Sequence, residues 1–122
     1  MKPKILVVDD QESILELLKA ILERENFEVF LAANGFDALD IIAHNEIDLV
    51  ITDVSMPELD GFTLLQIIKN RYPNLPVIVM TGYYDIYTKE EAIKYGASRF
   101  LPKPFRPEEV LKIISNELGV PQ

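Results

Sequence analysis

The sequence contains no cysteine among its 122 residues. This absence excludes disulfide bonds, thiolate nucleophiles, and zinc or iron–sulfur sites built on cysteine. Histidine occurs only once, at position 44, near the predicted end of a helix. One imidazole cannot form a metal site alone, and we interpret His44 as a solvated side chain rather than a phosphohistidine. Cysteine chemistry is therefore excluded, and imidazole chemistry is disfavoured.

Long apolar runs are also missing. No run approaches the roughly 18 residues that a membrane-spanning helix needs. The first four residues, 1–4, lead into only four apolar residues, which is too short for the core of a signal peptide. We therefore expect no membrane partner and no export, and the lack of cysteine fits a cytoplasmic location.

Positive charge is scarce. The sequence has 12 Lys and Arg residues but 20 Asp and Glu residues, which gives a net charge of −8. Binding of nucleic acid without regard to sequence depends on Lys and Arg that neutralise phosphates, so we expect none here. Partners with basic patches and divalent cations are electrostatically favoured instead. The alternative is that the acidity serves only solubility.

A strand-like segment followed by a helical pattern recurs five times, and no linker or low-complexity segment divides the chain. We therefore expect one domain over residues 1–122. The predicted strands are residues 4–8, 28–32, 49–52, 77–80 and 98–101. Strands that alternate with helices predict right-handed crossovers and a parallel sheet. Glu28 marks the second strand as the expected edge.

The segments between the strands are amphipathic. Apolar residues recur at helical spacing in the first of them, at Ile14, Leu17, Leu18, Ile21 and Leu22. The predicted starts of the later helices are Asn34-Gly35, the turn 59–61, a capping box at 88–91, and Pro107. These patterns predict an α/β fold, a doubly wound (βα)5 flavodoxin-like sandwich with a five-stranded parallel sheet in the order 2-1-3-4-5.

Polar residues that suit phosphate or metal chemistry follow four of the predicted strands. They are Asp9 and Asp10, Asp53, Thr81, and Lys103. The carboxyl ends of parallel strands share one edge, where open α/β folds bind ligands. Three carboxylates at one place repel each other unless a cation joins them. A Mg²⁺ ion together with Lys103 balances the three negative charges, and Mg²⁺ favours such oxygen ligands.

With its charge neutralised, an aspartate can act as a nucleophile toward phosphorus. Phosphoryl transfer needs mostly positioning and charge stabilisation of three oxygens, which Mg²⁺, Lys103 and the Thr81 hydroxyl can supply. No residue in the set is an obvious general acid or base. The set therefore favours a protein that accepts and keeps a phosphoryl group over one that turns over a substrate quickly.

Each of these motifs also has a structural interpretation. Asp9-Asp10 is a common start of a helix, because aspartate is favoured in a first helical turn. Thr81-Gly82 and Lys103-Pro104 are compatible with ordinary turns. Their joint occurrence at four strand ends favours a functional site.

The chain resembles, from end to end, the receiver domain of bacterial two-component response regulators, the family that includes the chemotaxis regulators. The matching segments are residues 7–10, 52–61, 80–82 and 100–105. The resemblance implies that Asp53 is the phosphoacceptor and that Asp10 and Asp53 ligate Mg²⁺ directly. It further implies that Asp9 acts through a metal-bound water and that the Ser55 backbone carbonyl is another ligand.

The resemblance also assigns the switch and the partners. It implies that Thr81 is the switch hydroxyl, Phe100 the switch aromatic, and Lys103 the phosphate-binding cation, with a cis peptide before Pro104. The implied phosphodonor is a phosphohistidine on a sensor histidine kinase or a phosphotransfer protein. The implied downstream partner is a protein target or an output domain that docks on the fourth helix, fifth strand and fifth helix.

Aromatic residues near the predicted fourth helix lead to two further hypotheses. Tyr83, Tyr84 and Tyr87 are predicted to belong to the docking surface, because tyrosine is common in such surfaces. Tyr83 is also predicted to slow loss of the phosphoryl group by shielding it. Phe100 stands where the family often has tyrosine, so a switch step that needs a phenolic hydroxyl is not available.

Two other functions stay open. A Mg²⁺-dependent phosphohydrolase would use an aspartate nucleophile with a second aspartate two residues later, but Ser55 occupies that position. A receiver that binds partners without phosphorylation would not need the intact set of site residues. Only residues 119–122 follow the last predicted helix, so we expect no output domain in this chain. It is either a stand-alone receiver, a relay intermediate or part of a longer protein.

Overall fold

The computed structural model of the chain describes residues 2–56, 58–82 and 86–119, apart from the side chains of 86–88. Strands and helices alternate along it, as predicted. The strands are β1 (Lys4–Val8), β2 (Glu28–Ala32), β3 (Leu49–Asp53), β4 (Val77–Thr81) and β5 (Arg99–Pro102). The helices are α1 (Glu12–Arg24), α2 (Gly35–His44), α3 (Gly61–Arg71), α4 (Ile86–Lys94) and α5 (Pro107–Leu118).

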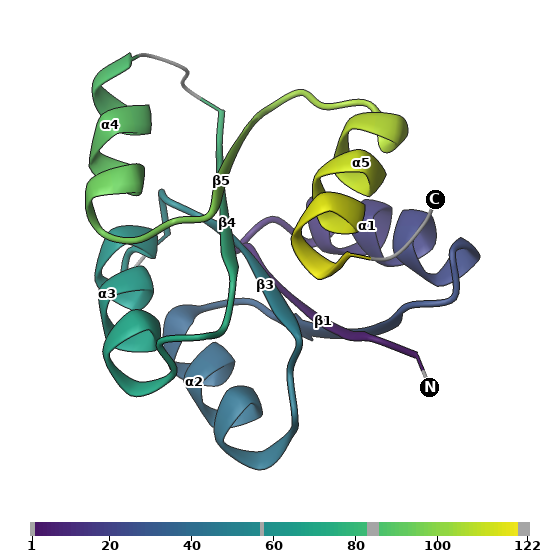
Figure 1. The fold of residues 1–122 in the computed structure, drawn as a ribbon, viewed down its shortest axis with the longest axis horizontal. Coiled ribbons are helices and arrows are strands. Elements are labelled where there is room, and N and C mark those ends of the chain that lie inside the picture. The colour runs from purple at the N-terminus through teal and green to yellow at the C-terminus, as the bar shows by residue number, and fades with distance from the viewer. Residues whose placement is uncertain (1, 57, 83–85, 120–122) are drawn as a thin grey trace.

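All five strands form one parallel sheet in the order β2-β1-β3-β4-β5 (Figure 1). The predicted doubly wound flavodoxin-like fold is thus confirmed, and β2 lies at one edge with Glu28 exposed, as expected. The register pairs Asp53 of β3 with Met80 of β4, and Thr81 with Pro102 of β5. The carboxyl ends of the central strands therefore meet at one edge of the sheet.

Helices cover both faces of the sheet (Figure 1). Helices α1 and α5 lie on one face, and α2, α3 and α4 lie on the other. Each face has its own cluster of buried apolar residues. Every residue of β3 and β4 is buried, which explains why these strands are nearly all apolar rather than alternating. The polar ends Asp53 and Thr81 are thus placed on rigid elements.

Side-chain oxygens cap the two helices that follow β2 and β3. The Asn34 side chain accepts a hydrogen bond from the Asp37 N–H at the start of α2. Asp60 accepts one from the Thr63 N–H, at 2.9 Å, at the start of α3. Such caps satisfy N–H groups that have no partner within the helix. Both helices begin where the sequence predicted.

The predicted apolar stripe of α1 is wrong at one position. Leu15, Leu18 and Leu22 are buried, whereas Leu17 is 45% exposed. The helix is so rich in leucine and isoleucine that two overlapping stripes satisfy helical spacing. Contact with the sheet selects the stripe through Leu15, and local spacing alone does not reveal that choice.

The predicted start of α4 is also wrong. The helix begins at Ile86, so Thr88 lies inside its first turns rather than at its cap. A Thr and a Glu three residues apart also share one face of a helix interior, so the spacing does not by itself mark a boundary. The predicted end is confirmed, because Gly96 follows the helix with a φ of 101°.

The remaining differences concern single residues at the strand ends. Strands β3 and β4 each run one residue beyond the predicted end and include Asp53 and Thr81. Strand β5 begins at Arg99 rather than at residue 98 and ends at Pro102. Within the described residues, no helix has the length and apolar character needed to span a membrane.

Candidate functional site

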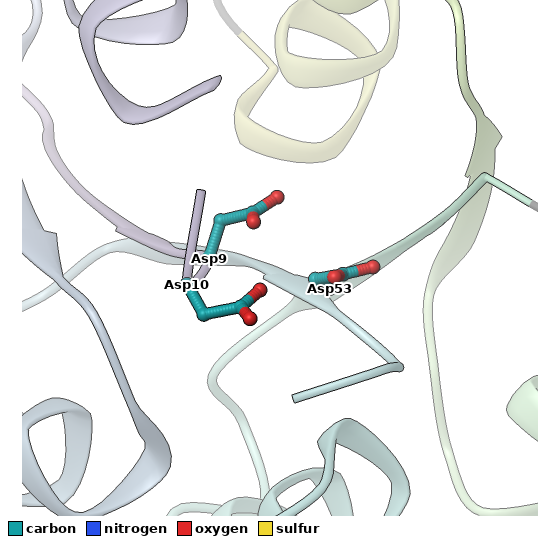
Figure 2. Close-up of side chains that lie close together, drawn as sticks. All are labelled: Asp9, Asp10 and Asp53. Carbon is teal, nitrogen blue, oxygen red and sulfur yellow. The ribbon is translucent and has the colours of Figure 1, made fainter. Parts of the chain in front are cut away.

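Three carboxylates meet at the carboxyl ends of β1 and β3 (Figure 2). Oxygens of Asp9, Asp10 and Asp53 all lie within 4.8 Å of one another. Asp9 is fully buried and Asp53 is 5% exposed, while Asp10 is exposed to solvent. The fold therefore brings together the three acidic residues that the sequence placed at two strand ends, and it leaves one of them open to solution.

One lysine lies against this acidic cluster. The Nζ atom of Lys103, which follows β5, lies 2.7 Å from Oδ2 of Asp9 and 3.6 Å from Oδ1 of Asp53. The Lys103 N–H donates to the Thr81 carbonyl, and the Lys103–Pro104 peptide is cis, as the resemblance implied. Against three carboxylates, one ammonium leaves the cluster with two uncompensated negative charges when all groups are ionised.

Burial raises the pKa of Asp53 above the ordinary value of an aspartate, and the negative charge of Asp9 raises it further. The Lys103 ammonium and the backbone N–H groups of Ser55 and Val54 lower the pKa, but they do not fully offset the burial. The ionised form of Asp53 is therefore less favourable in the fold than in the unfolded chain. A further cation beside Asp53 would relieve this penalty.

We predict that Asp53→Asn stabilises the protein in the absence of divalent cations. The raised pKa means that protonation of Asp53 stabilises the fold at low pH, and this stabilisation is lost as the pH rises through the raised value. Asparagine stays neutral at all pH values, so at pH 7 the variant should be more stable by about 1 kcal/mol, the size of a typical single-substitution effect.

Thermal melts in chelator check this prediction. A gain of about 1 kcal/mol corresponds to a few degrees in Tm for a domain of this size. The gain should shrink as the pH falls towards the range in which Asp53 itself becomes protonated. A variant that melts at or below the wild-type temperature at pH 7 would contradict the account.

A surface cleft of about 590 Å³ opens above the acidic cluster. Its lining residues are Asp10, Gln11, Asp53, Val54, Ser55, Phe62, Thr81, Gly82 and Lys103. Thr81 is 4% exposed at the end of β4, and Ser55 is exposed. Phe100 is half-buried on β5 and packs against the core beneath α2, α3 and α4. The predicted site residues other than Asp9 and Phe100 thus line one cleft.

Sequence reasoning did not assign three residues of this region to the site. The Gln11 N–H donates to Oδ1 of Asp9 at 2.9 Å and helps to orient that carboxylate. Phe62 adds a large apolar side chain to the lining. A Cβ on Gly61 would collide with the carbonyl oxygen of Asp53 and lie 2.5 Å from Cα of Val54. The Asp60-Gly61 turn signal was recognised, but this close approach depends on the tertiary fold.

The acidic cluster fits a hard divalent cation such as Mg²⁺. Its donors are carboxylate oxygens, its charge is negative, and Asp10 is open to solvent, which leaves room for the water ligands that Mg²⁺ retains. Lys103 occupies one side of Asp9, so Asp10 and Asp53 are the carboxylates best placed to contact an ion directly. The predicted cation is therefore compatible with the residues present.

The structure does not test the two hypotheses about tyrosines, the docking surface and the shielding of the phosphoryl group. Tyr83 and Tyr84 lie outside the described residues, and the side chain of Tyr87 does too. Both hypotheses therefore stay predictions from the sequence.

Comparison with known proteins agrees with the fold. The family model of the response regulator receiver domain matches residues 5–115. A putative response regulator NtrX-like from Rickettsia bellii is 39% identical over 118 residues, which make up 95% of this chain and 25% of that protein. The response regulator MprA from a Mycobacterium species is 39% identical over 91% of this chain and 48% of its own length. The chain thus spans a quarter to a half of these relatives.

Solved structures give the same result. A signal receiver domain of an HD domain-containing protein from Pseudomonas fluorescens superposes with a TM-score of 0.92 at 36% identity, covering 98% of this chain and 96% of that one. The chemotaxis protein CheY4 from Vibrio cholerae superposes with a TM-score of 0.92 at 32% identity, covering 97% and 100% of the two chains. The chain belongs to the family of response regulator receiver domains of two-component systems.

Proposed function

We propose that this chain is a phosphorylation-dependent switch that accepts a phosphoryl group on Asp53. The observation that carries the proposal is the position of Asp53, which is nearly buried at the base of an open cleft between one lysine and two further carboxylates. Asp53 is 5% exposed and lines this cleft, so the cleft gives a phosphodonor access to its carboxylate. We further propose that residues 1–122 act as one receiver domain.

The proposed transfer begins with attack by a carboxylate oxygen of Asp53 on the phosphorus of a phosphohistidine. A bond forms between that oxygen and phosphorus, the bond between phosphorus and the imidazole nitrogen breaks, and the electron pair stays with the imidazole. The Lys103 ammonium, 3.6 Å from Oδ1 of Asp53, is placed to stabilise negative charge on the phosphoryl oxygens. Thr81 adds a hydroxyl to the same cleft.

We propose that Mg²⁺ is held by Asp10, Asp53 and the Ser55 backbone carbonyl, with Asp9 acting through a bound water. When bound, the ion would neutralise charge on the carboxylates and on the phosphoryl oxygens. Asp9 then has a separate task, because its contact of 2.7 Å with Lys103 fixes the ammonium beside the acceptor. These two roles, contact with Lys103 for Asp9 and direct metal binding for Asp10, agree with the burial of Asp9 and the exposure of Asp10.

Phosphorylation would change the charge at Asp53 from −1 to about −2 and add three acceptor oxygens. We propose that the Thr81 hydroxyl moves to these oxygens and that Phe100 then shifts into the space behind it. Thr81 ends β4, and Phe100 lies on the neighbouring strand β5, paired with Val79 in the register. The shift would remodel the surface formed by α4, β5 and α5, on which a downstream protein or an output domain docks.

The partners follow from the family. We propose a sensor histidine kinase or a phosphotransfer protein as the donor, and cytoplasm as the place of action. The curated relatives named here extend beyond the matched region, which agrees with output through further domains in those proteins. We propose no direct binding of nucleic acid by this domain, because its net charge is −8.

Acetyl phosphate tests the proposed function without a cognate kinase. Incubation with Mg²⁺ should add the mass of one phosphoryl group to the intact protein, and chelator should prevent the addition. A parallel assay with a small phosphate ester separates the switch from the phosphohydrolase, since Ser55 stands where such an enzyme would carry its second aspartate. Fast release of phosphate from the ester without stable mass addition would refute the switch.

We also predict that Mg²⁺ stabilises the unphosphorylated fold. At 100 times its Kd, a ligand that binds only the folded state adds about 2.7 kcal/mol. For a domain of this size that gain raises Tm on the order of 10 °C. Asp10→Asn should lose most of the gain, because it removes the exposed carboxylate of the cluster.

The control for this thermal-shift experiment is Glu16→Gln, which removes an equal charge from an exposed position on α1. It should keep the full response to Mg²⁺. An equal response in Asp10→Asn and Glu16→Gln would show that the ion acts through general charge screening rather than at the acidic cluster.

A further inference from the structure

Phe62, in the first turn of α3, is an apolar exception in a polar cleft. Among the lining residues that the structure describes, only Val54 and Phe62 carry apolar side chains of any size. Phe62 is half-buried and packs against the core beneath α2, α3 and α4. Neither metal binding nor attack on phosphorus uses an aromatic ring, so the proposed function leaves Phe62 without a role.

The Phe62 ring packs against the ring of Tyr95, the residue directly after α4. The two ring centroids lie 6.1 Å apart with planes tilted by 60°, which is within the range of favourable aromatic pairs. Lys94 adds its ammonium over the Tyr95 ring, 5.7 Å from the centroid. Tyr95 therefore contacts Phe62 of α3 and Lys94 of α4, and it is placed to restrict the position of the Phe62 ring.

Few of the α4 side chains that the structure describes contribute to the core. Among its described side chains only Ala92 is buried, and Ile93 is 57% exposed. The aromatic pair is thus a substantial contact between the end of this helix and the element that borders the cleft.

We propose that Phe62 forms the apolar wall of the acceptor cleft and that Tyr95, acting through Phe62, positions this wall so that water reaches the aspartyl phosphate slowly. The proposal rests on the function proposed for Asp53. In this role Tyr95 is a positioning residue, and the pair sets the lifetime of the phosphorylated state.

The step that the wall limits is hydrolysis. A water oxygen attacks phosphorus, the bond between phosphorus and the Asp53 oxygen breaks, and the electron pair returns to the carboxylate. The products are the free Asp53 carboxylate and inorganic phosphate, and the proton of the water passes to phosphate or solvent. An aromatic ring offers this water no hydrogen bond and excludes part of the volume it would occupy, so removal of the ring should speed this step.

The test is the half-life of the phosphorylated protein after removal of acetyl phosphate, followed by intact mass. Phe62→Ala should shorten the half-life about three- to tenfold, the change produced by lowering the barrier by roughly 0.7–1.4 kcal/mol. Tyr95→Ala should shorten it in the same direction, whereas Tyr95→Phe and Phe62→Leu should stay near the wild-type value. In a Phe62→Ala background, Tyr95→Ala should have no further effect, because its action passes through the missing ring.

The matched control is Tyr72→Ala, which truncates another half-buried tyrosine packed on the same core cluster. It should lower Tm without changing the half-life, which separates positioning from general loosening. Unchanged half-lives in Phe62→Ala and Tyr95→Ala would overturn the proposal, as would additive effects in the double variant. Failure of the wild type to take up a phosphoryl group would refute the function proposed for Asp53, and with it this proposal. Normal uptake with unchanged half-lives in the variants would refute only the role of Phe62 and Tyr95.

Discussion

Asp53→Asn is expected to abolish phosphoryl uptake from acetyl phosphate. An amide lacks the charged oxygen that attacks phosphorus, and it also removes one of the carboxylates proposed to hold Mg²⁺. Asp9 and Asp10 lie within 4.8 Å of this position, yet neither is proposed to substitute for it. Asp9 is fully buried and its carboxylate contacts Lys103. Asp10 follows β1, the strand next to the one that carries Asp53.

Intact mass after incubation with acetyl phosphate and Mg²⁺ measures this loss. The variant should stay at its unmodified mass under conditions in which the wild type and Glu16→Gln gain one phosphoryl group. The expected increase in Tm of Asp53→Asn in chelator shows independently that a silent variant is folded. A variant that still gains one phosphoryl group at the wild-type rate would place the acceptor elsewhere.

Gly61→Ala is expected to destabilise the fold strongly and to impair the site at the same time. The added methyl group would collide with the Asp53 carbonyl oxygen and with the backbone of Val54, not with the end of a flexible side chain. The start of α3 must therefore move away from the end of β3, which also weakens the hydrogen bond of 3.0 Å from the Gly61 N–H to the Val54 carbonyl. Overpacking typically costs about 1–3 kcal/mol, and we expect the upper end here because the contacted atoms belong to the backbone.

Chemical denaturation gives the free energy of unfolding of this variant, and Gly82→Ala is its control. Among the described residues, a Cβ at Gly82 meets no heavy atom within 4 Å, although Gly82 lines the same cleft. Gly82→Ala should therefore change stability by less than about 0.5 kcal/mol, as surface substitutions usually do. Equal stabilities of the two alanine variants would contradict the packing of α3 against the end of β3.

The fold was predictable because its main constraints are local and repeated. Strands buried on both faces read as short apolar runs, and alternation with amphipathic helices leaves few arrangements other than a doubly wound parallel sheet. The site followed from the same logic, since parallel strands bring Asp53, Thr81 and Lys103 to one edge without any knowledge of side-chain contacts. The strand pattern alone therefore predicts that these residues, although distant in sequence, lie close together.

The errors and omissions arose where tertiary contacts choose between locally equivalent options. The choice of Leu15 over Leu17 depends on how α1 rotates on the sheet, and both stripes satisfy the helical period. Likewise, the packing of Phe62 on Tyr95 joins residues that no local pattern relates. The start of α4 at Ile86 was missed because its Thr-x-x-Glu spacing suits a helix interior as well as a cap.

The central claim is that one particular carboxylate carries the phosphoryl group. Hydride reduction of an aspartyl phosphate converts the modified aspartate to homoserine, which peptide mass mapping then locates. After treatment of the wild type with acetyl phosphate and Mg²⁺, the account predicts homoserine at position 53 alone, and none when chelator replaces Mg²⁺. Homoserine at position 9 or 10, or its appearance at position 53 regardless of chelator, would contradict the account.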